Sequence, residues 1–135
     1  MNIENTDPRP AADAVRVLLV EDHADTAAAL ADLLELMGHR PVVAGSVGEA
    51  LAAAEREAAA IDLVISDLGL PDGSGHDLMR ELARRHGLAG IALSGYGMEE
   101  DVRQSLEAGF EKHLTKPVSL PQLQATLREV AGVVE

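Results

Sequence analysis

The chain has 135 residues, of which 47% are hydrophobic and 25% charged, a composition typical of one globular domain with a buried core. Its net charge of −12 opposes binding to nucleic acid or to an anionic membrane, because both require a cationic surface. The absence of cysteine excludes disulfides and thiolate metal sites. We find no apolar run long enough to insert into a membrane and no secretory signal, and therefore expect a cytoplasmic protein.

The first 13 residues differ from the rest of the chain. They are polar, contain two prolines and show no hydrophobic periodicity. Such a segment cannot bury enough apolar surface to offset its conformational entropy. We therefore expect residues 1–13 to be a disordered leader or linker, and residues 14–135 to form the folded domain.

Apolar runs and helical patterns alternate along the remainder of the chain. Short apolar runs bounded by turn residues predict strands at 15–20, 41–44, 63–67, 90–94 and 111–115. Helical spacing predicts helices from 24 to 37, 47 to 60, 76 to 85, 98 to 108 and from 120 onward. Five strands that alternate with five helices indicate an α/β fold, doubly wound, in which helices cover both faces of a five-stranded parallel sheet.

Several residues predict details of these elements. Pro41 lacks an N–H group, which favours an edge position for the second strand. Ser46 and Ser119 are followed three residues later by Glu49 and Gln122, the pattern of a helix capping box. In the helix at 98–108, Val102 and Leu106 are expected to face the core.

The chemically suggestive side chains all follow predicted strands. Glu21 and Asp22 follow the first strand, Asp67 ends the third, Ser94 ends the fourth and Lys116 follows the fifth. The carboxyl ends of parallel strands meet at one edge, so these groups are expected to converge there. The acidic pair alone could instead be a helix N-cap.

Three converging carboxylates repel one another unless a cation lies among them or one is protonated. Oxygen ligands of this kind suit Mg²⁺. Ser94 and Lys116 could hold the oxygens of a phosphoryl group, and the Asp67 carboxylate could be the nucleophile that forms an aspartyl phosphate.

This ordered set resembles the receiver domain of the two-component response-regulator family, over roughly residues 15–131. The matching residues are Glu21–Asp22, Asp67, Pro71, Gly75, Ser94 and Lys116–Pro117. The resemblance implies a flavodoxin-like (βα)5 fold with the strand order 2-1-3-4-5.

The resemblance also implies roles for these residues. Asp67 would be the phosphoacceptor, and a sensor histidine kinase or a histidine phosphotransfer protein would supply the phosphoryl group. Lys116 and Ser94 would bind that group, and the Lys116–Pro117 peptide bond would be cis. Magnesium would be held by four groups, which are the side chains of Glu21, Asp22 and Asp67 and the backbone carbonyl of Gly69.

One position departs from the family pattern. Receivers usually have an aromatic residue three positions before the lysine, where it rotates inward as the hydroxyl residue moves, and this chain has His113. A histidine packs less area and can titrate near neutral pH. Tyr96 could replace the aromatic switch in part, and together with Gly69 it lies where the family tends to set the dephosphorylation rate.

We interpret the chain as a stand-alone single-domain response regulator, a switch whose only catalysis is its own phosphotransfer and dephosphorylation. Its output would pass through the fourth helix, fifth strand and fifth helix to a protein target. An alternative is the receiver of a hybrid histidine kinase, which the runs at 92–103 and 109–117 resemble. A degenerate receiver that acts as a constitutive interaction module is another.

An enzyme is the remaining alternative. A haloacid-dehalogenase-like phosphatase also uses a strand-end Asp and Mg²⁺. However, that family has a second Asp two positions after the nucleophile, where this chain has Gly69.

Overall fold

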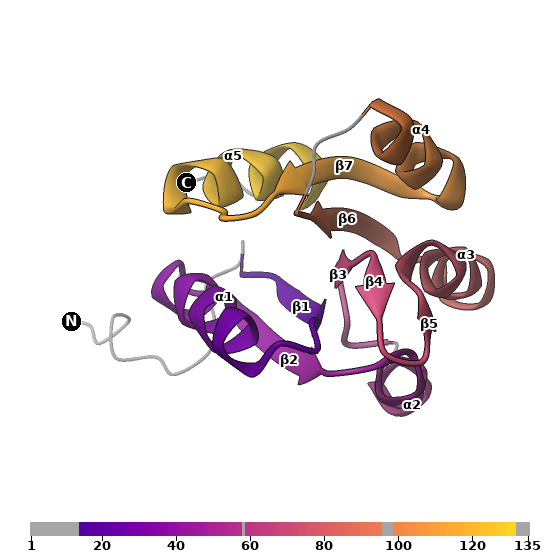
Figure 1. Ribbon diagram of the computed structural model, residues 1–135. Helices are drawn as coiled ribbons and strands as arrows, with labels where there is room; N and C mark the ends of the chain where they lie inside the picture. The colour runs from indigo at the N-terminus through magenta and orange to yellow at the C-terminus, as the bar shows by residue number, and fades with distance from the viewer. Residues whose placement is uncertain (1–13, 58, 96–98, 132–135) are drawn as a thin grey trace.

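The computed structural model describes residues 14–57, 59–95 and 99–131 (Figure 1). The expected leader at 1–13 and Tyr96 lie outside these residues. The strands are β1 (Arg16–Val20), β2 (Arg40–Ala44), β3 (Leu63–Asp67), β4 (Gly69–Leu70), β5 (Gly73–Ser74), β6 (Ala89–Ser94) and β7 (Phe110–Thr115). The helices are α1 (Ala24–Leu36), α2 (Val47–Glu57), α3 (Gly75–His86), α4 (Glu99–Ala108) and α5 (Leu120–Ala131).

The main sheet has the order β2-β1-β3-β6-β7, and every neighbouring pair of strands is parallel. This is the predicted order 2-1-3-4-5 once the short hairpin β4–β5 between β3 and α3 is set aside. Pro41 lies on the edge strand β2, as its missing N–H group requires. The hairpin β4–β5, which is antiparallel, was not predicted.

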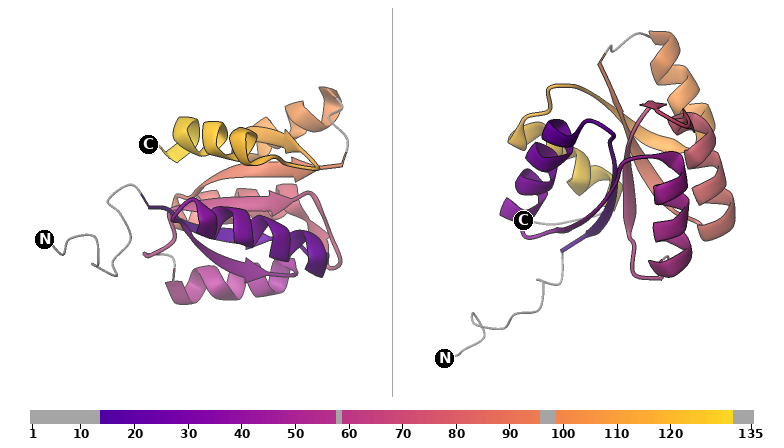
Figure 2. Two further views of the ribbon diagram at one scale, coloured as in Figure 1. Left: turned by 90° about the vertical axis from the view of Figure 1, so that its left-hand side faces the viewer. Right: turned by 60° about the horizontal axis from the view of Figure 1, so that its bottom comes forward.

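Helices cover both faces of the sheet, with α1 and α5 on one side and α2, α3 and α4 on the other (Figure 2, right). Alternate residues of each strand enter the two resulting cores. Val17, Leu19 and Ile65 belong to the core beneath α1 and α5, whereas Leu18, Val20 and Val64 belong to the other. Each such fully buried aliphatic side chain contributes about 1.5–3 kcal/mol to folding.

Both predicted capping residues accept a hydrogen bond from the helix they precede. Ser119 Oγ accepts from the Gln122 N–H, and the Gln122 side chain accepts from the Ser119 N–H at 3.1 Å. Ser46 Oγ accepts from the Glu49 N–H at 3.1 Å, but the Glu49 carboxylate accepts from Gly45 N. In a regular capping box the Glu49 carboxylate would accept from the N–H of Ser46 itself, so at α2 this second bond comes from the residue one position earlier.

The expectation that Leu106 faces the core is wrong, because its side chain is 53% exposed. Between residues 102 and 108 of α4, the buried side chains are instead those of Ser105 and Ala108, which are 0% and 3% exposed. Both are small, so they allow the helix to approach its neighbours closely, and this helical phase turns Leu106 toward solvent.

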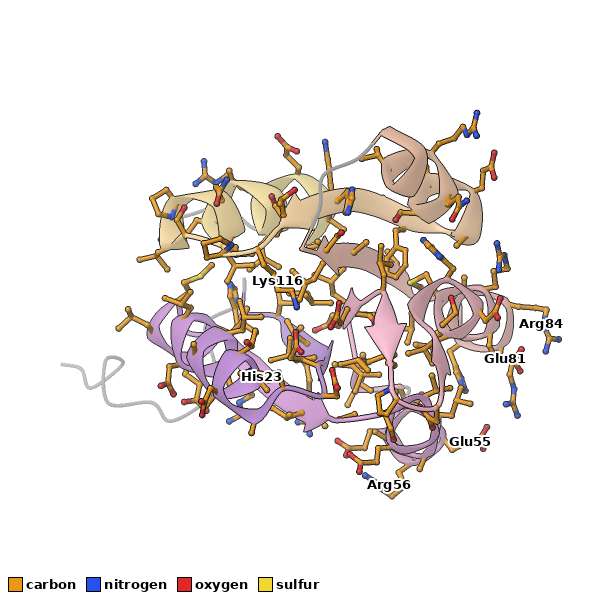
Figure 3. All side chains as sticks on the ribbon, viewed as in Figure 1. His23, Glu55, Arg56, Glu81, Arg84 and Lys116 are labelled. Carbon is orange, nitrogen blue, oxygen red and sulfur yellow. The ribbon has the colours of Figure 1, made fainter. Side chains whose placement is uncertain are left out.

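The outer surfaces of α2 and α3 have ion pairs between charged side chains (Figure 3). Arg84 pairs with Glu81 at 2.9 Å within α3, and Arg85 reaches Glu55 of α2 at 3.0 Å. Exposed pairs of this kind contribute little to stability, about 0–1 kcal/mol each. Among the described residues, no helix combines the length and the apolar character needed to cross a bilayer.

Candidate functional site

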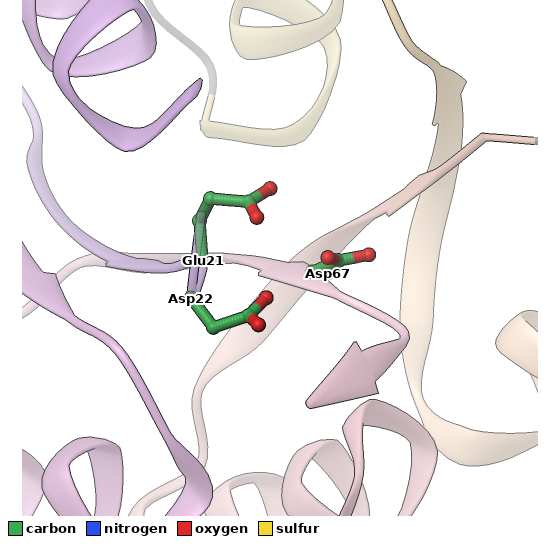
Figure 4. Close-up of side chains that lie close together, drawn as sticks. All are labelled: Glu21, Asp22 and Asp67. Carbon is green, nitrogen blue, oxygen red and sulfur yellow. The ribbon is translucent and has the colours of Figure 1, made fainter. Parts of the chain in front are cut away.

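Three carboxylates converge where β1 and β3 end. Glu21 and Asp22 directly follow β1, and Asp67 is the last residue of β3. Their side chains point into a common space (Figure 4), and one oxygen from each lies within 4.8 Å of the others. The three carboxylates therefore converge at the strand ends, as the sequence predicts.

Lys116 extends toward the same space from the chain segment after β7 (Figure 3). Its Nζ lies 3.0 Å from Glu21 Oε1 and 3.4 Å from Asp67 Oδ2. These contacts join residues that are 95 and 49 positions apart in the chain. The ammonium group therefore lies between two of the three carboxylates.

The charge of Lys116 is set by two opposing effects. Burial lowers the pKa of the ammonium group, whereas the hydrogen bond to Glu21 and the charge of Asp67 raise it. The attractive contacts prevail, and the pKa lies above its ordinary value. Lys116 is therefore a fixed cation at neutral pH.

Glu21 is held more firmly than the other two acids. It is 2% exposed, and its Oε2 accepts a hydrogen bond from the His23 backbone N–H at 3.0 Å while Oε1 faces Lys116. Asp22 is exposed to solvent. Asp67 Oδ1 accepts from the Leu68 N–H at 2.8 Å.

The simpler interpretation of the acidic pair, a helix N-cap, is wrong. The N-cap residue of α1 is His23, whose side chain accepts a hydrogen bond from Thr26 N at 3.3 Å. Because His23 caps the helix, the carboxylates of Glu21 and Asp22 remain at the strand ends, where they face Asp67.

The loop after Asp67 returns very close to the strand it leaves. The Gly75 N–H donates to the Leu68 carbonyl at 2.9 Å. A Cβ atom on Gly75 would lie 2.2 Å from the Asp67 carbonyl oxygen, far inside van der Waals contact. Only glycine allows this approach, which fixes the start of α3 against the residue that bears the candidate nucleophile.

The remaining candidates occupy the predicted elements. Ser94 is the last residue of β6 and 6% exposed, and its carbonyl accepts from the Lys116 N–H at 2.7 Å. His113 is half-buried on β7, opposite Ala92. The Lys116–Pro117 peptide bond is cis. Gly69, two residues beyond Asp67, begins β4.

One residue near the site was not among the sequence candidates. Asp72 lies in the turn of the β4–β5 hairpin, and its carboxylate accepts from the Val47 and Gly48 N–H groups at the start of α2. The sequence shows only an Asp between Pro and Gly, which indicates a turn. No local pattern could predict a partner 25 residues away.

The donor set fits a divalent cation. Three carboxylates and one ammonium leave a formal charge of −2 at the site. With the ligand oxygens no more than 4.8 Å apart and an effective dielectric constant of about 20, each carboxylate pair repels by at least about 3.5 kcal/mol. All-oxygen donors favour Mg²⁺ or Ca²⁺ over softer metals.

A cavity of about 450 Å³ adjoins Lys116 between α1 and the segment that leads from β7 to α5. Its lining is mainly apolar and includes Leu30 and Leu33 of α1 together with Pro117 and Val118. Asp25 and Thr26 lie at the same cavity.

Comparisons with known proteins agree with this geometry. The family model described as the response regulator receiver domain matches residues 17–128. A 14.6 kDa protein from the sodA1 3' region of Leptolyngbya boryana is 40% identical over 76% of this chain and 79% of its own length. The KDP operon transcriptional regulatory protein KdpE of Escherichia coli is 39% identical over 83% of this chain, which spans about half (49%) of KdpE.

Among solved structures, the receiver domain of the sensor histidine kinase PA1611 from Pseudomonas aeruginosa superposes with a TM-score of 0.79. It is 28% identical and covers 88% of this chain and 98% of its own. That structure has a magnesium ion coordinated in its active site cleft. The parallel sheet in this order, the strand-end acids and the family match over most of the chain lead to one conclusion: the chain belongs to the response regulator receiver domain family.

Proposed function

We propose that the chain is a phosphoacceptor switch in which Asp67 accepts a phosphoryl group in a reaction that requires Mg²⁺. The observation that supports this most strongly is the placement of Lys116 Nζ, 3.4 Å from Asp67 and 3.0 Å from Glu21, beside a cluster of three carboxylates. A nucleophile, a fixed cation and a metal-binding donor set are thus within reach of one phosphoryl group.

The three acids would divide the work of holding the metal. Both oxygens of Glu21 already have partners, Lys116 and the His23 N–H, so Glu21 contributes mainly its charge. Asp22 is exposed, and the contact of Asp67 with Lys116 is the longer of the two lysine contacts at 3.4 Å, so we propose Asp22 and Asp67 as the direct ligands. The carbonyl of Gly69 is the proposed backbone ligand. The bound ion would neutralise the phosphoryl oxygens during transfer.

The protein's own groups account for the remaining steps. A carboxylate oxygen of Asp67 attacks the phosphorus of a phosphohistidine, the P–N bond breaks, and the imidazole leaves as an acyl phosphate forms. Lys116 then exchanges part of its contact with Asp67 for the new phosphoryl oxygens. The Ser94 hydroxyl, at the end of the neighbouring strand β6, is the proposed second donor.

Receiver domains interact with histidine kinases and phosphotransfer proteins, and we propose one of these as the phosphodonor. The proposed output face is formed by α4, β7 and α5. Backbone contact supports a link from the site to this face, because Lys116 N donates to Ser94 O across β6 and β7. Leu106 supplies an exposed apolar side chain there, and Lys112 of β7 pairs with Glu129 of α5 at 2.8 Å.

Two parent proteins fit this chain. A stand-alone regulator is our first proposal, supported by the Leptolyngbya relative, a 14.6 kDa protein that the match covers over 79% of its length. The receiver of a hybrid kinase is the alternative, supported by the similarity to the PA1611 receiver. A cytoplasmic location is part of the proposal in both cases, because the proposed phosphodonors are kinases and phosphotransfer proteins.

The test is incubation with acetyl phosphate, with either Mg²⁺ or a chelator, followed by intact-mass analysis. Wild-type protein should gain one phosphoryl group only with Mg²⁺, and Asp67→Asn should gain none. Asp77→Asn is the matched control, since Asp77 is an aspartate in the first turn of α3 whose side chain is 78% exposed. It should be labelled like the wild type.

Other outcomes would favour the rival functions. Steady turnover of a phosphomonoester, with no stoichiometric label, would indicate a phosphatase. No labelling of the wild type by any phosphodonor would indicate a constitutive interaction module.

A further inference from the structure

The hairpin β4–β5 is tied to the start of α2 by one carboxylate. Asp72 Oδ1 accepts from the Val47 N–H at 2.7 Å, and Oδ2 accepts from the Gly48 N–H at 2.9 Å. Figure 1 shows the hairpin extending from the end of β3 toward α2. Asp72 thus binds two residues, Val47 and Gly48, that precede it by 25 and 24 positions in the chain.

These two bonds form part of the cap of α2. The first four N–H groups of a helix lack partners inside it. At α2, Asp72 accepts from the N–H groups of Val47 and Gly48, and Ser46 Oγ accepts from that of Glu49, while the bond from Ala50 N to the Ser46 carbonyl is the first bond of the helix itself. The helix start therefore holds Asp72 with a paired hydrogen bond that a simple turn residue would not make.

The other end of the hairpin is joined to the phosphoacceptor. Gly69 and Leu70 of β4 pair with Ser74 and Gly73 of β5, and Gly75 N donates to the Leu68 carbonyl. The tip also touches α2, since a Cβ on Gly73 would lie only 3.2 Å from Val47 Cγ2. Gly69 therefore lies between the strand end that bears Asp67 and the tip that α2 holds.

We propose that Asp72 is a positioning residue, which fixes the carbonyl of Gly69 for the metal by clamping the β4–β5 hairpin to the N-terminus of α2. This inference rests on the proposed phosphoacceptor function, in which Gly69 supplies a backbone ligand. The alternative is that Asp72 only stabilises α2. Both roles predict a loss of stability on substitution, so stability alone cannot separate them.

The ionisation state of the Asp72 carboxylate supports the proposed clamp. The hydrogen bonds from the Gly48 and Val47 N–H groups hold the pKa of Asp72 below its ordinary value. The group is therefore an anion at neutral pH, the form that accepts both bonds and that a helix N-terminus favours.

The experiment compares three variants of the full chain, Asp72→Ala, Asp72→Asn and Ser46→Ala. Ser46→Ala is the matched control, because it removes a cap at the same helix end without touching the hairpin. One readout is the Mg²⁺ dissociation constant by calorimetry. The other is amide hydrogen exchange of residues 69–74 without metal, which reports on the hairpin alone.

Asp72→Ala should raise the Mg²⁺ dissociation constant about three- to tenfold, near the lower limit for residues that orient a metal ligand. It should also speed exchange in the hairpin. Asp72→Asn keeps one acceptor oxygen and should lie between Asp72→Ala and wild type. Ser46→Ala should change neither readout.

The proposal would be overturned if Asp72→Ala and Ser46→Ala changed the Mg²⁺ dissociation constant and the hairpin exchange equally. It would also be overturned if Asp72→Ala bound Mg²⁺ with the same dissociation constant as the wild type. These results differ from failure of the proposed function, in which wild-type protein itself would take up no Mg²⁺ and no label.

Discussion

Gly75→Ala is a direct test of how the loop after the phosphoacceptor is built. The added methyl group would lie 2.2 Å from the Asp67 carbonyl oxygen, 2.9 Å from Leu68 Cα and 3.1 Å from Asp67 C. All three are backbone atoms, so no side-chain rotation can relieve the overlap. The loop must move by about 1 Å to restore an ordinary contact.

Two opposing effects set the magnitude. Alanine is favoured over glycine in the middle of a helix by about 0.5–1 kcal/mol, which is an upper bound for the gain at Gly75, the first residue of α3. Overpacking costs about 1–3 kcal/mol, and rigid backbone neighbours place this site at the upper end. We expect a net loss of about 2 kcal/mol in the free energy of unfolding. For a domain of this length, that loss lowers the Tm by about 7 °C.

The assay is urea unfolding of wild type and Gly75→Ala, monitored by circular dichroism. Gly69→Ala is the control, because nothing lies within 4 Å of the position that its methyl group would take. Its stability should change by less than about 0.5 kcal/mol. If Gly75→Ala had the same free energy of unfolding as the wild type, the close approach of the loop to Asp67 would be refuted.

Three further predictions concern charge and hydrogen bonding. Lys116→Met should tighten Mg²⁺ binding about tenfold by removing a cation from the site, and should slow labelling by acetyl phosphate about 100-fold; looser binding would contradict the placement of the ammonium. His39→Leu should cost about 1–3 kcal/mol in urea unfolding, because the buried Val15 N–H, which donates to His39 Nδ1 at 2.9 Å, loses its acceptor. His39→Asn, whose Oδ1 can replace Nδ1, should recover most of that loss. In the folded protein the pKa of Asp72 lies below 3.8, its ordinary value. The ionised carboxylate therefore stabilises the fold above about pH 4, and this contribution is lost as the pH falls through the pKa of the folded state. Wild-type stability should therefore fall more steeply than that of Asp72→Asn between about pH 5 and 2, and parallel curves would refute this.

Local patterns were sufficient to predict the main elements and the position of the site. Each apolar run that ends in a polar residue marks the carboxyl end of a strand, and parallel pairing brings those ends together. Glu21, Asp67, Ser94 and Lys116 could therefore be assigned to one edge from the sequence alone.

What escaped the sequence depends on contacts between distant segments. Leu106 has the spacing of a core residue, but the small Ser105 and Ala108 set the phase of α4 against its neighbours. Asp72 has the local context of a turn, and its bonds to α2 exist only after the sheet has formed. Neither effect has a periodic signature.

The central claim is that Asp67 itself receives the phosphoryl group. Its most direct test is treatment with acetyl phosphate and Mg²⁺, reduction with borohydride, and peptide mapping by tandem mass spectrometry. Borohydride converts an aspartyl phosphate to homoserine, so the account predicts homoserine at position 67 alone. Homoserine at Asp22, a reduced Glu21, or an unmodified Asp67 would contradict it.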